Sequence, residues 1–215
     1  MSQAILFDMD GTLVDTAVDI VDALNLALQQ HGFPQANFDD VHQYTSDGSR
    51  GLINAAVGAL DEQRFTQVQQ SLFQHYLSTN GRSAQLYPGI ARLLEICDSK
   101  GIAYGVITNK PARFSRPLLQ QLNLDKRCAT IISGDTCLKA KPSSMPMRLA
   151  ANQTQVDCKN TWYLGDARRD IEAALAVGMH PVAVSWGYIK AEDPIASWPQ
   201  HTVIDSPLDM LDLIK

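Results

Sequence analysis

The chain opens with an apolar run over residues 4–7 that meets its first charged residue at Asp8. A short continuous apolar run is typical of a strand buried on both faces, whereas alternation indicates a strand with one face in water. Asp10 and Gly11 follow closely. Two carboxylates after a buried strand need a cation or an open rim, since burying them unpaired costs several kcal/mol. Ligands bind at that rim in open α/β sheets, so we expect a functional site here.

Helical periodicity replaces the strand pattern after this point. Apolar positions between residues 16 and 86 recur at helical spacing, and no segment from 16 to 84 reads as a convincing strand. The pattern predicts helices over residues 16–31, 38–44, 52–59 and 62–77, with a loop of sequence T-S-D-G-S-R-G over 45–51. We therefore expect residues 16–86 to form an all-helical domain.

Strands and helices alternate from residue 87 onward. The expected strands are 103–107, 130–132, 162–164, 182–184 and 203–204, and the expected helices are 90–99, 112–122, 144–152, 167–177 and 208–214. Such alternation predicts a parallel sheet with helices on both faces. We predict an α/β fold in which residues 1–15 and 87–215 form one doubly wound core. The helical domain of residues 16–86 is then an insertion between the two parts of that core.

Composition and charge narrow the classes of function. The chain has 215 residues, 45% of them hydrophobic, and a net charge of −5 from 18 Lys plus Arg against 23 Asp plus Glu. The absence of a basic tract argues against nucleic acid as a partner, and no apolar run has the length of a membrane span. The N-terminal sequence enters a strand without a signal-peptide pattern, so we expect a cytoplasmic protein.

Four cysteines, Cys97, Cys128, Cys137 and Cys158, are spread through the core sequence without C-x-x-C spacing. This spacing favours reduced thiols that serve in packing, and redox or zinc-binding roles are the alternatives.

The D-x-D-G-T pattern at residues 8–12, placed after a hydrophobic strand, resembles the first motif of the haloacid dehalogenase superfamily of phosphotransferases. The later motifs of that superfamily follow in the same order: Thr108 with Asn109, then Lys141, then Gly165 with Asp166, and Asp170. The resemblance covers nearly the whole chain and is specific as a set, although each later motif alone is weak. It implies that the helical insertion is a cap over the active site.

Asp8 and Asp10 are the candidate catalytic residues. Hydrolysis of a phosphate monoester is among the slowest uncatalysed reactions, and a carboxylate nucleophile needs a cation beside the phosphoryl group. Asp8, the first residue after the strand, is the candidate nucleophile, which forms an aspartyl-phosphate. Asp10 is suited to protonate the leaving oxygen and then to take a proton from the attacking water.

Magnesium is the expected cofactor, because it prefers oxygen ligands and needs only one or two carboxylates besides substrate and water. Asp8 and Asp166 are the expected side-chain ligands, and the resemblance implies that Asp10 adds its backbone carbonyl. Asp170, four residues beyond Asp166, is expected on the same helix face, where it holds a metal-bound water or orients Lys141. The alternative is that Asp166 and Asp170 are N-terminal helix charges stabilised by the helix dipole.

Thr108, Asn109 and Lys141 are the candidate phosphate-binding residues. Thr108 ends a strand, as Asp8 does, and its hydroxyl together with the Asn109 N–H can hold a phosphate oxygen at a helix N-terminus. Lys141 can neutralise phosphate charge, and Lys139 is the alternative. The K-P pair formed with the following proline resembles the superfamily motif and favours Lys141.

Substrate selection is expected in the helical domain. Arg50, in the glycine-bearing loop over 45–51, is the candidate to bind a substrate carboxylate or sugar oxygen. The alternative is a solvated surface arginine.

Within the superfamily, Asp10 favours hydrolysis of a phosphate ester, since dehalogenases and phosphonate hydrolases lack an aspartate there. The chain resembles phosphoglycolate and N-acetylmuramic acid 6-phosphate phosphatases, and the stretches T-N-K-P-A-R-F at 108–114 and W-G-Y-I at 186–189 are particularly similar to the latter. We expect a magnesium-dependent phosphatase, monomer or homodimer, that acts on a phosphoglycolate-like or sugar phosphate monoester. The alternatives are an N-acetylmuramic acid 6-phosphate phosphatase, a sugar phosphomutase and a non-catalytic binding protein of this fold.

Overall fold

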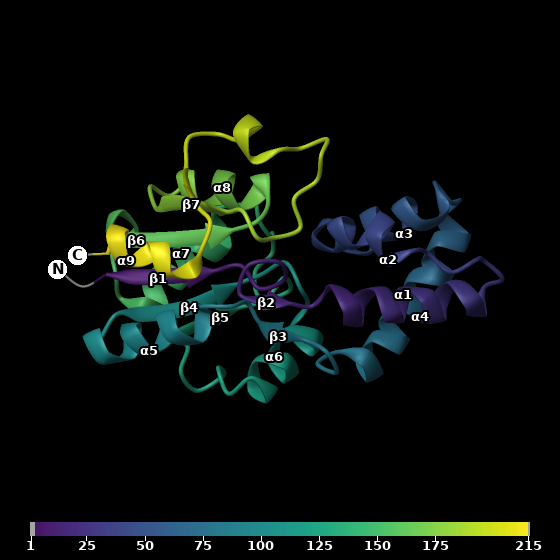
Figure 1. The fold of residues 1–215 in the computed structure, drawn as a ribbon, viewed down its shortest axis with the longest axis horizontal. Coiled ribbons are helices and arrows are strands. Elements are labelled where there is room, and N and C mark those ends of the chain that lie inside the picture. The colour runs from purple at the N-terminus through teal and green to yellow at the C-terminus, as the bar shows by residue number, and fades with distance from the viewer. Residues whose placement is uncertain (1–2, 215) are drawn as a thin grey trace. The chain divides into compact units, whose positions relative to one another are not determined.

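In the computed structural model, which describes residues 3–214, six parallel strands form the main sheet (Figure 1). Their order across the sheet is β5 (Thr130–Ile132), β4 (Ala103–Ile107), β1 (Ala4–Phe7), β6 (Thr161–Gly165), β7 (His180–Val184) and β8 (Thr202–Ile204). Every neighbouring pair in this sheet is parallel. The predicted α/β fold with a parallel sheet is confirmed.

Helices precede or follow most of these strands along the chain. They are α5 (Ile90–Lys100), α6 (Ala112–Gln121), α7 (Met145–Thr154), α8 (Arg168–Leu175) and α9 (Met210–Leu213), with short 3-10 helices at Cys158–Asn160, Ile195–Ser197 and Pro207–Asp209. Met147 of α7 and Ala173 of α8 share one fully buried cluster with Leu6, Ile107 and Tyr163 of the sheet. The side chains of β1 are at most 1% exposed, as the apolar run predicts.

The central strand β1 ends within one residue of both of its neighbours. Its last residue, Phe7, is in register with Val106 of β4 and with Leu164 of β6. Because the three strands run parallel, the residues that follow them lie at one edge of the sheet. These residues are Asp8, Thr108 and Asp166.

The chain divides into two compact units. One comprises the residues up to Val14 together with those from Leu86 on, and the other is Asp15–Gln85. Two short strands, β2 (Val14–Asp15) and β3 (Gln85–Leu86), lie where the chain passes between the units, and they pair with each other. A strand of two residues has no periodicity, so the sequence pattern does not reveal it.

The second unit is helical throughout its elements. It contains α1 (Ala17–Gln30), α2 (Phe38–Val41), the 3-10 helix η1 (His42–Asp47), α3 (Gly48–Val57) and α4 (Glu62–Thr79). Helices α1 and α4 are packed together, and both contribute fully buried apolar side chains, Leu24 and Leu28 from α1 and Val68 from α4. The described residues from 16 to 84 contain no strand, as the sequence indicates.

The prediction of a loop over residues 45–51 is wrong. Thr45 lies in η1, and α3 begins at Gly48, so the segment is helical almost throughout. Serine, aspartate and glycine favour turns, but they also favour the start of a helix, and the sequence pattern does not separate the two. Gly48 has a φ of +71°, which permits the change of direction between η1 and α3.

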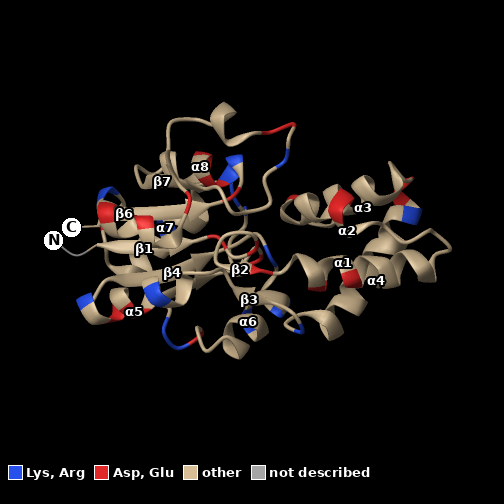
Figure 2. Cartoon of the chain, viewed as in Figure 1, with Lys and Arg blue, Asp and Glu red and all other residues tan. Residues whose placement is uncertain are grey.

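No helix among residues 3–214 is long and apolar enough to span a membrane. Lysines and arginines are scattered among acidic residues on helices and loops (Figure 2). The four cysteines are free thiols, and Cys97, a residue of α5, is buried.

Candidate active site

Three buried carboxylates gather where β1 and β6 end. Asp8 follows β1, Asp166 follows β6, and Asp170 lies in the first turn of α8. Each offers a carboxylate oxygen, and the three oxygens lie within 4.8 Å of one another. Their residues are 4, 2 and 0% exposed, respectively. Carboxylates this close together and away from water need a cation to offset their charge, so the cluster is a candidate metal site.

The crowding of negative charge alters the acidity of this cluster. Burial, followed by the charges of Asp8 and Asp170, raises the pKa of Asp166 to about 7. Burial also raises the pKa of Asp170, although the Lys141 ammonium opposes that shift. Carboxylate oxygens are the ligands that hard divalent cations prefer, so the donor set fits Mg²⁺.

The turn after β1 packs directly against Asp166. The Met9 N–H donates to Oδ1 of Asp8 at 2.7 Å, and the Thr12 hydroxyl donates to Oδ1 of Asp166 at 3.3 Å. Gly11 has a φ of +80°, and a Cβ atom there would lie 2.0 Å from Oδ2 of Asp166. Both the backbone conformation and the available space therefore require glycine in the D-x-D-G-T turn.

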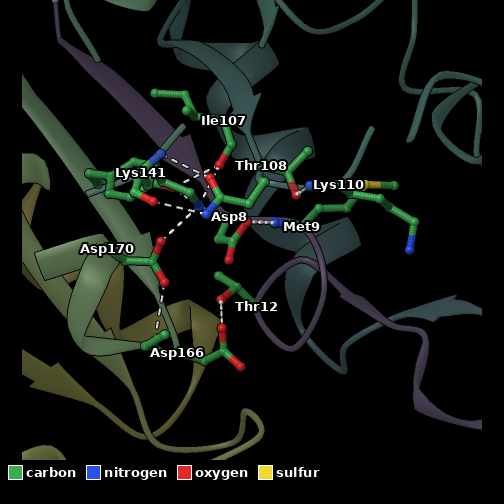
Figure 3. A network of polar contacts seen from close by, with 12 residues as sticks. Asp8, Met9, Thr12, Ile107, Thr108, Lys110, Lys141, Asp166 and Asp170 are labelled. Carbon is green, nitrogen blue, oxygen red and sulfur yellow. Dashed lines mark hydrogen bonds and ion pairs between the residues drawn. The ribbon is translucent and has the colours of Figure 1, made fainter. Parts of the chain in front are cut away.

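A buried lysine, Lys141, lies beside these carboxylates (Figure 3). Its Nζ is 2.9 Å from Oδ1 of Asp8 and 2.7 Å from Oδ1 of Asp170. The ammonium also donates to the Ile107 carbonyl oxygen at 2.8 Å and to the Tyr163 hydroxyl oxygen at 2.7 Å. The Tyr163 hydroxyl in turn donates to the Ile107 carbonyl oxygen at 2.7 Å. Lys141 is therefore held directly beside the candidate nucleophile.

Tyr163 is a site residue that sequence reasoning missed. It lies in β6, inside an apolar stretch, and is fully buried. Burial and the nearby carboxylates of Asp170 and Asp8 raise its pKa well above the usual range, so its hydroxyl stays protonated and able to donate. The sequence feature that could have revealed it is a tyrosine within a buried strand, because a buried hydroxyl requires a hydrogen-bond partner.

Asn109 fixes the loop that carries Lys141. Its side-chain amide donates to the Lys141 carbonyl oxygen at 3.0 Å, and its side-chain oxygen accepts from the Lys141 N–H at 3.0 Å. Thr108 is buried, and its Oγ1 accepts from the Lys110 N–H at 3.1 Å. Lys139, the alternative to Lys141, is exposed. The structure thus brings Thr108, Asn109 and Lys141 together with the carboxylate cluster.

Asp10 pairs with a second buried lysine that sequence reasoning also missed. Nζ of Lys110 lies 2.7 Å from Oδ1 of Asp10, and the two side chains are 5 and 14% exposed. The signal was present in the T-N-K stretch, but a lysine before a proline in a loop is usually solvated. Figure 3 shows Lys110 and Lys141 on opposite sides of Asp8.

The W-G-Y-I stretch after β7 holds Asp166 in place. The Tyr188 N–H donates to Oδ2 of Asp166 at 3.0 Å, and the Trp186 indole N–H donates to the Thr12 carbonyl oxygen at 3.1 Å. A Cβ atom on Gly187 would lie 2.2 Å from Cβ of Asp166. The sequence showed this stretch only as a resemblance, and the structure gives it a physical role beside the carboxylate cluster.

The expectation that Asp166 and Asp170 share a helix face is wrong. Helix α8 begins at Arg168, so Asp166 precedes it. Asp170 lies in its first turn, where Oδ2 accepts from the Ala167 N–H at 3.1 Å. This cap agrees with the helix N-terminal alternative for Asp170, while Oδ1 of the same carboxylate contacts Lys141. The two aspartates meet because the turn between β6 and α8 is short.

Arg50, the remaining candidate, lies in α3 of the helical unit. Its guanidinium donates to both carboxylate oxygens of Glu62, at 2.9 and 3.1 Å, and stacks 3.8 Å from the ring centroid of Phe65. The side chain is 54% exposed. These contacts all lie within the helical unit.

Comparison with known proteins gives this site a context. A model of the haloacid dehalogenase-like hydrolase family matches residues 5–184. The chain is 34% identical to an N-acetylmuramic acid 6-phosphate phosphatase of Pseudomonas aeruginosa over 213 residues, which cover 99% of this chain and 94% of that protein. It is 35% identical to a phosphoglycolate phosphatase of Xanthomonas campestris, with 95% of this chain and 93% of that protein covered.

Solved structures share the fold. The crystal structure of a predicted phosphoglycolate phosphatase from Haemophilus somnus superposes with a TM-score of 0.89 at 26% identity. The match covers 100% of this chain and 98% of that one. The similarity therefore includes the helical unit as well as the sheet.

Proposed function

The chain belongs to the haloacid dehalogenase-like hydrolase family, and we propose that it is a magnesium-dependent phosphatase that hydrolyses a small-molecule phosphate monoester. One observation carries this proposal. The Asp8 carboxylate lies 2.9 Å from the Lys141 ammonium and belongs to the buried acidic cluster. A nucleophile between a fixed cation and a metal site suits attack on a phosphoryl group, which carries negative charge itself.

The reaction proceeds in two steps on the residues of this unit. Asp8 attacks phosphorus and the ester bond breaks, while Asp10 gives its proton to the leaving oxygen, so that an alcohol departs. Asp10 then takes a proton from water as that water attacks the aspartyl-phosphate, and this step releases phosphate and restores Asp8. Lys141, Thr108 and the Asn109 N–H hold the phosphoryl oxygens during both steps.

Asp8 and Asp166 would hold Mg²⁺ with their side chains, and Asp10 with its backbone carbonyl. When bound, this ion neutralises charge on the phosphoryl group and on the carboxylates. Asp170 acts on the same cluster through Lys141, whose ammonium it contacts at 2.7 Å. The Tyr188 N–H and Gly187 keep Asp166 turned towards Asp8.

The substrate is a phosphoglycolate-like or sugar phosphate ester, because the relatives of this chain carry names of both kinds. We propose that the helical unit selects it as a cap, with Arg50 as the residue that meets its carboxylate or sugar oxygens. The proposal also includes a cytoplasmic location, as expected from the sequence, and no nucleic-acid or membrane partner.

The test is release of inorganic phosphate from an aryl ester without a carboxylate, p-nitrophenyl phosphate, followed by a panel of phosphoglycolate, N-acetylmuramic acid 6-phosphate and sugar phosphates. We expect release that needs Mg²⁺ and stops in excess chelator. A phosphomutase would instead return the phosphoryl group to a sugar, and a binding protein would release none. Absence of phosphate release from every ester in the presence of Mg²⁺ would contradict the proposed function.

A further inference from the structure

The two buried lysines of the site have different surroundings. Nζ of Lys141 has four oxygen neighbours at 2.9 Å or less, which exceeds the three N–H groups of an ammonium. All N–H groups of Lys141 are therefore used on the side of the site that holds the nucleophile. Lys110 contacts Asp10 instead, at 2.7 Å, on the other side of Asp8 (Figure 3).

Burying an ammonium costs free energy, so the position of a buried lysine indicates where the site uses positive charge. Lys110 is 5% exposed, and the carboxylate that it contacts is the proposed acid for the leaving oxygen. The positive charge therefore lies where the alcohol part of the substrate departs. The phosphoryl group is served separately by Lys141, at the opposite side of Asp8.

The reach of Lys110 follows from ordinary hydrogen-bond lengths. When Oδ1 of Asp10, which contacts Lys110, also bonds the ester oxygen, two hydrogen bonds in series place Nζ up to about 5.6 Å from that oxygen. A carboxylate on the carbon bonded to the ester oxygen puts its own oxygens roughly 3 Å from the ester oxygen. With the atoms extended in one line, the remaining gap is about 2.8 Å, which is the length of a charge-assisted hydrogen bond.

We infer that Lys110 recognises a carboxylate on the carbon next to the ester oxygen, so that the preferred substrate is a phosphate ester of a 2-hydroxy acid. This inference rests on the proposed phosphatase function and deepens it. Lys110 then bonds both the substrate carboxylate and Asp10, and it brings the leaving oxygen to the acid. An N-acetylmuramic acid 6-phosphate does not meet this requirement, because its carboxylate lies many bonds away from the phosphate ester.

The experiment compares two substrates of equal length, phosphoglycolate and 2-hydroxyethyl phosphate, which replaces the carboxylate with a neutral hydroxymethyl group. For the unmodified protein we expect kcat/KM to favour phosphoglycolate by about 10- to 100-fold, the range for a hydrogen bond to a charged group. Lys110→Met should bring this ratio close to one, chiefly through the KM of phosphoglycolate. Lys110→Arg, which keeps the charge, should retain part of the preference.

The ratio separates recognition from a general loss of activity, since Lys110→Met also removes the ion pair with Asp10 on both substrates. Lys139→Met is the matched control, because Lys139 is exposed and should keep the ratio of the unmodified protein. Equal turnover of the two esters by the unmodified protein would overturn the inference even if the variant does not fold. An unchanged ratio in folded Lys110→Met, or faster hydrolysis of N-acetylmuramic acid 6-phosphate, would overturn it as well.

Turnover of p-nitrophenyl phosphate, which has no carboxylate, tests the proposed function independently of Lys110. Turnover of that ester without a preference for phosphoglycolate removes only the role of Lys110. Lack of turnover of all these esters removes the phosphatase function and the inference together.

Discussion

At the scale of single residues, the candidate nucleophile is distinguished from its neighbours by what surrounds it. Asp8 is buried, bonded by the Met9 N–H and adjacent to the Lys141 ammonium. These contacts hold its carboxylate in one orientation at the end of β1. A group that must attack in line benefits from being oriented before substrate arrives.

We therefore predict that Asp8→Asn abolishes turnover with the fold retained. The amide has the same shape but removes both the nucleophilic charge and a metal ligand, so kcat should fall at least about 1000-fold, or ~4 kcal/mol. The measurement is steady-state phosphate release, with circular dichroism as the check on folding. Substantial activity in the sequence-verified variant would remove Asp8 from its proposed role.

Asp166 provides a prediction about pH. Its pKa is raised to about 7 in the folded protein, mainly by burial, against about 3.9 for a free aspartate. The folded state thus holds this proton more tightly, so its contribution to stability is complete below about pH 4 and is lost as the pH rises through about 7. In chelator, the melting temperature should fall over this range, and Mg²⁺ should raise it most at the high end.

Asp166→Asn should weaken that fall, because the amide does not titrate. Asp212→Asn, at an exposed position of α9, is the control and should keep the full pH dependence. Thermal denaturation in chelator from about pH 5 to pH 8 measures all three proteins. Identical slopes for Asp166→Asn and the unmodified protein would show that Asp166 is not the titrating group.

At the scale of elements, the site depends on a loop far from the D-x-D-G-T turn in the sequence. The segment after β7 places the Tyr188 N–H on Asp166 and the Trp186 indole on the turn after β1. Gly187 allows this approach, since a Cβ there would lie 2.2 Å from Cβ of Asp166 and 2.6 Å from the Gly11 carbonyl oxygen. The loop therefore clamps Asp166 against the nucleophile turn.

Gly187→Ala should displace Asp166 and weaken Mg²⁺ binding. We expect at least about a tenfold rise in the Mg²⁺ concentration needed for half-maximal thermal stabilisation, the scale on which residues that support metal ligands act. Gly178→Ala serves as the control, because its positive φ of +75° makes it destabilising while no atom lies within 4 Å of the added Cβ. It should lower the melting temperature and leave Mg²⁺ affinity unchanged. Equal Mg²⁺ affinity in both variants would mean that the loop does not position Asp166.

At the scale of the whole molecule, the chain consists of an α/β unit that holds the entire acidic cluster and a helical unit that holds Arg50. Arg50 is anchored within its unit by Glu62 and Phe65. Such an exposed ion pair contributes little to stability, typically under about 1 kcal/mol. A functional role for Arg50 is therefore distinguishable from a structural one.

If the helical unit selects substrate through Arg50, Arg50→Ala should lower kcat/KM for the natural ester by roughly 1–3 kcal/mol and barely affect an aryl phosphate. Glu62→Ala removes the same ion pair from the other side and is the matched control. It should leave both substrates near the unmodified values. Equal losses for both variants would assign Arg50 to the helical unit's stability, and no loss in either would leave it a surface arginine.

The sequence by itself determined the parts of this protein that depend on local pattern. The apolar run of β1, the alternation after residue 87 and the helical periodicity of residues 16–84 predicted the α/β fold and its helical segment. Parallel strands that end together then place Asp8, Thr108 and Asp166 at one edge. Such features can be predicted because each follows from the period of a single element and from the direction of its neighbours.

Only the tertiary structure decided which groups support the site. Lys110 meets Asp10 across 100 positions of sequence, and Trp186 meets Thr12 across 174. The tertiary structure likewise decided the role of Tyr163, the start of α8 after Asp166 and the pairing of Arg50 with Glu62. These contacts join separate elements whose side chains are brought together by packing, and local periodicity contains no information on which of them meet.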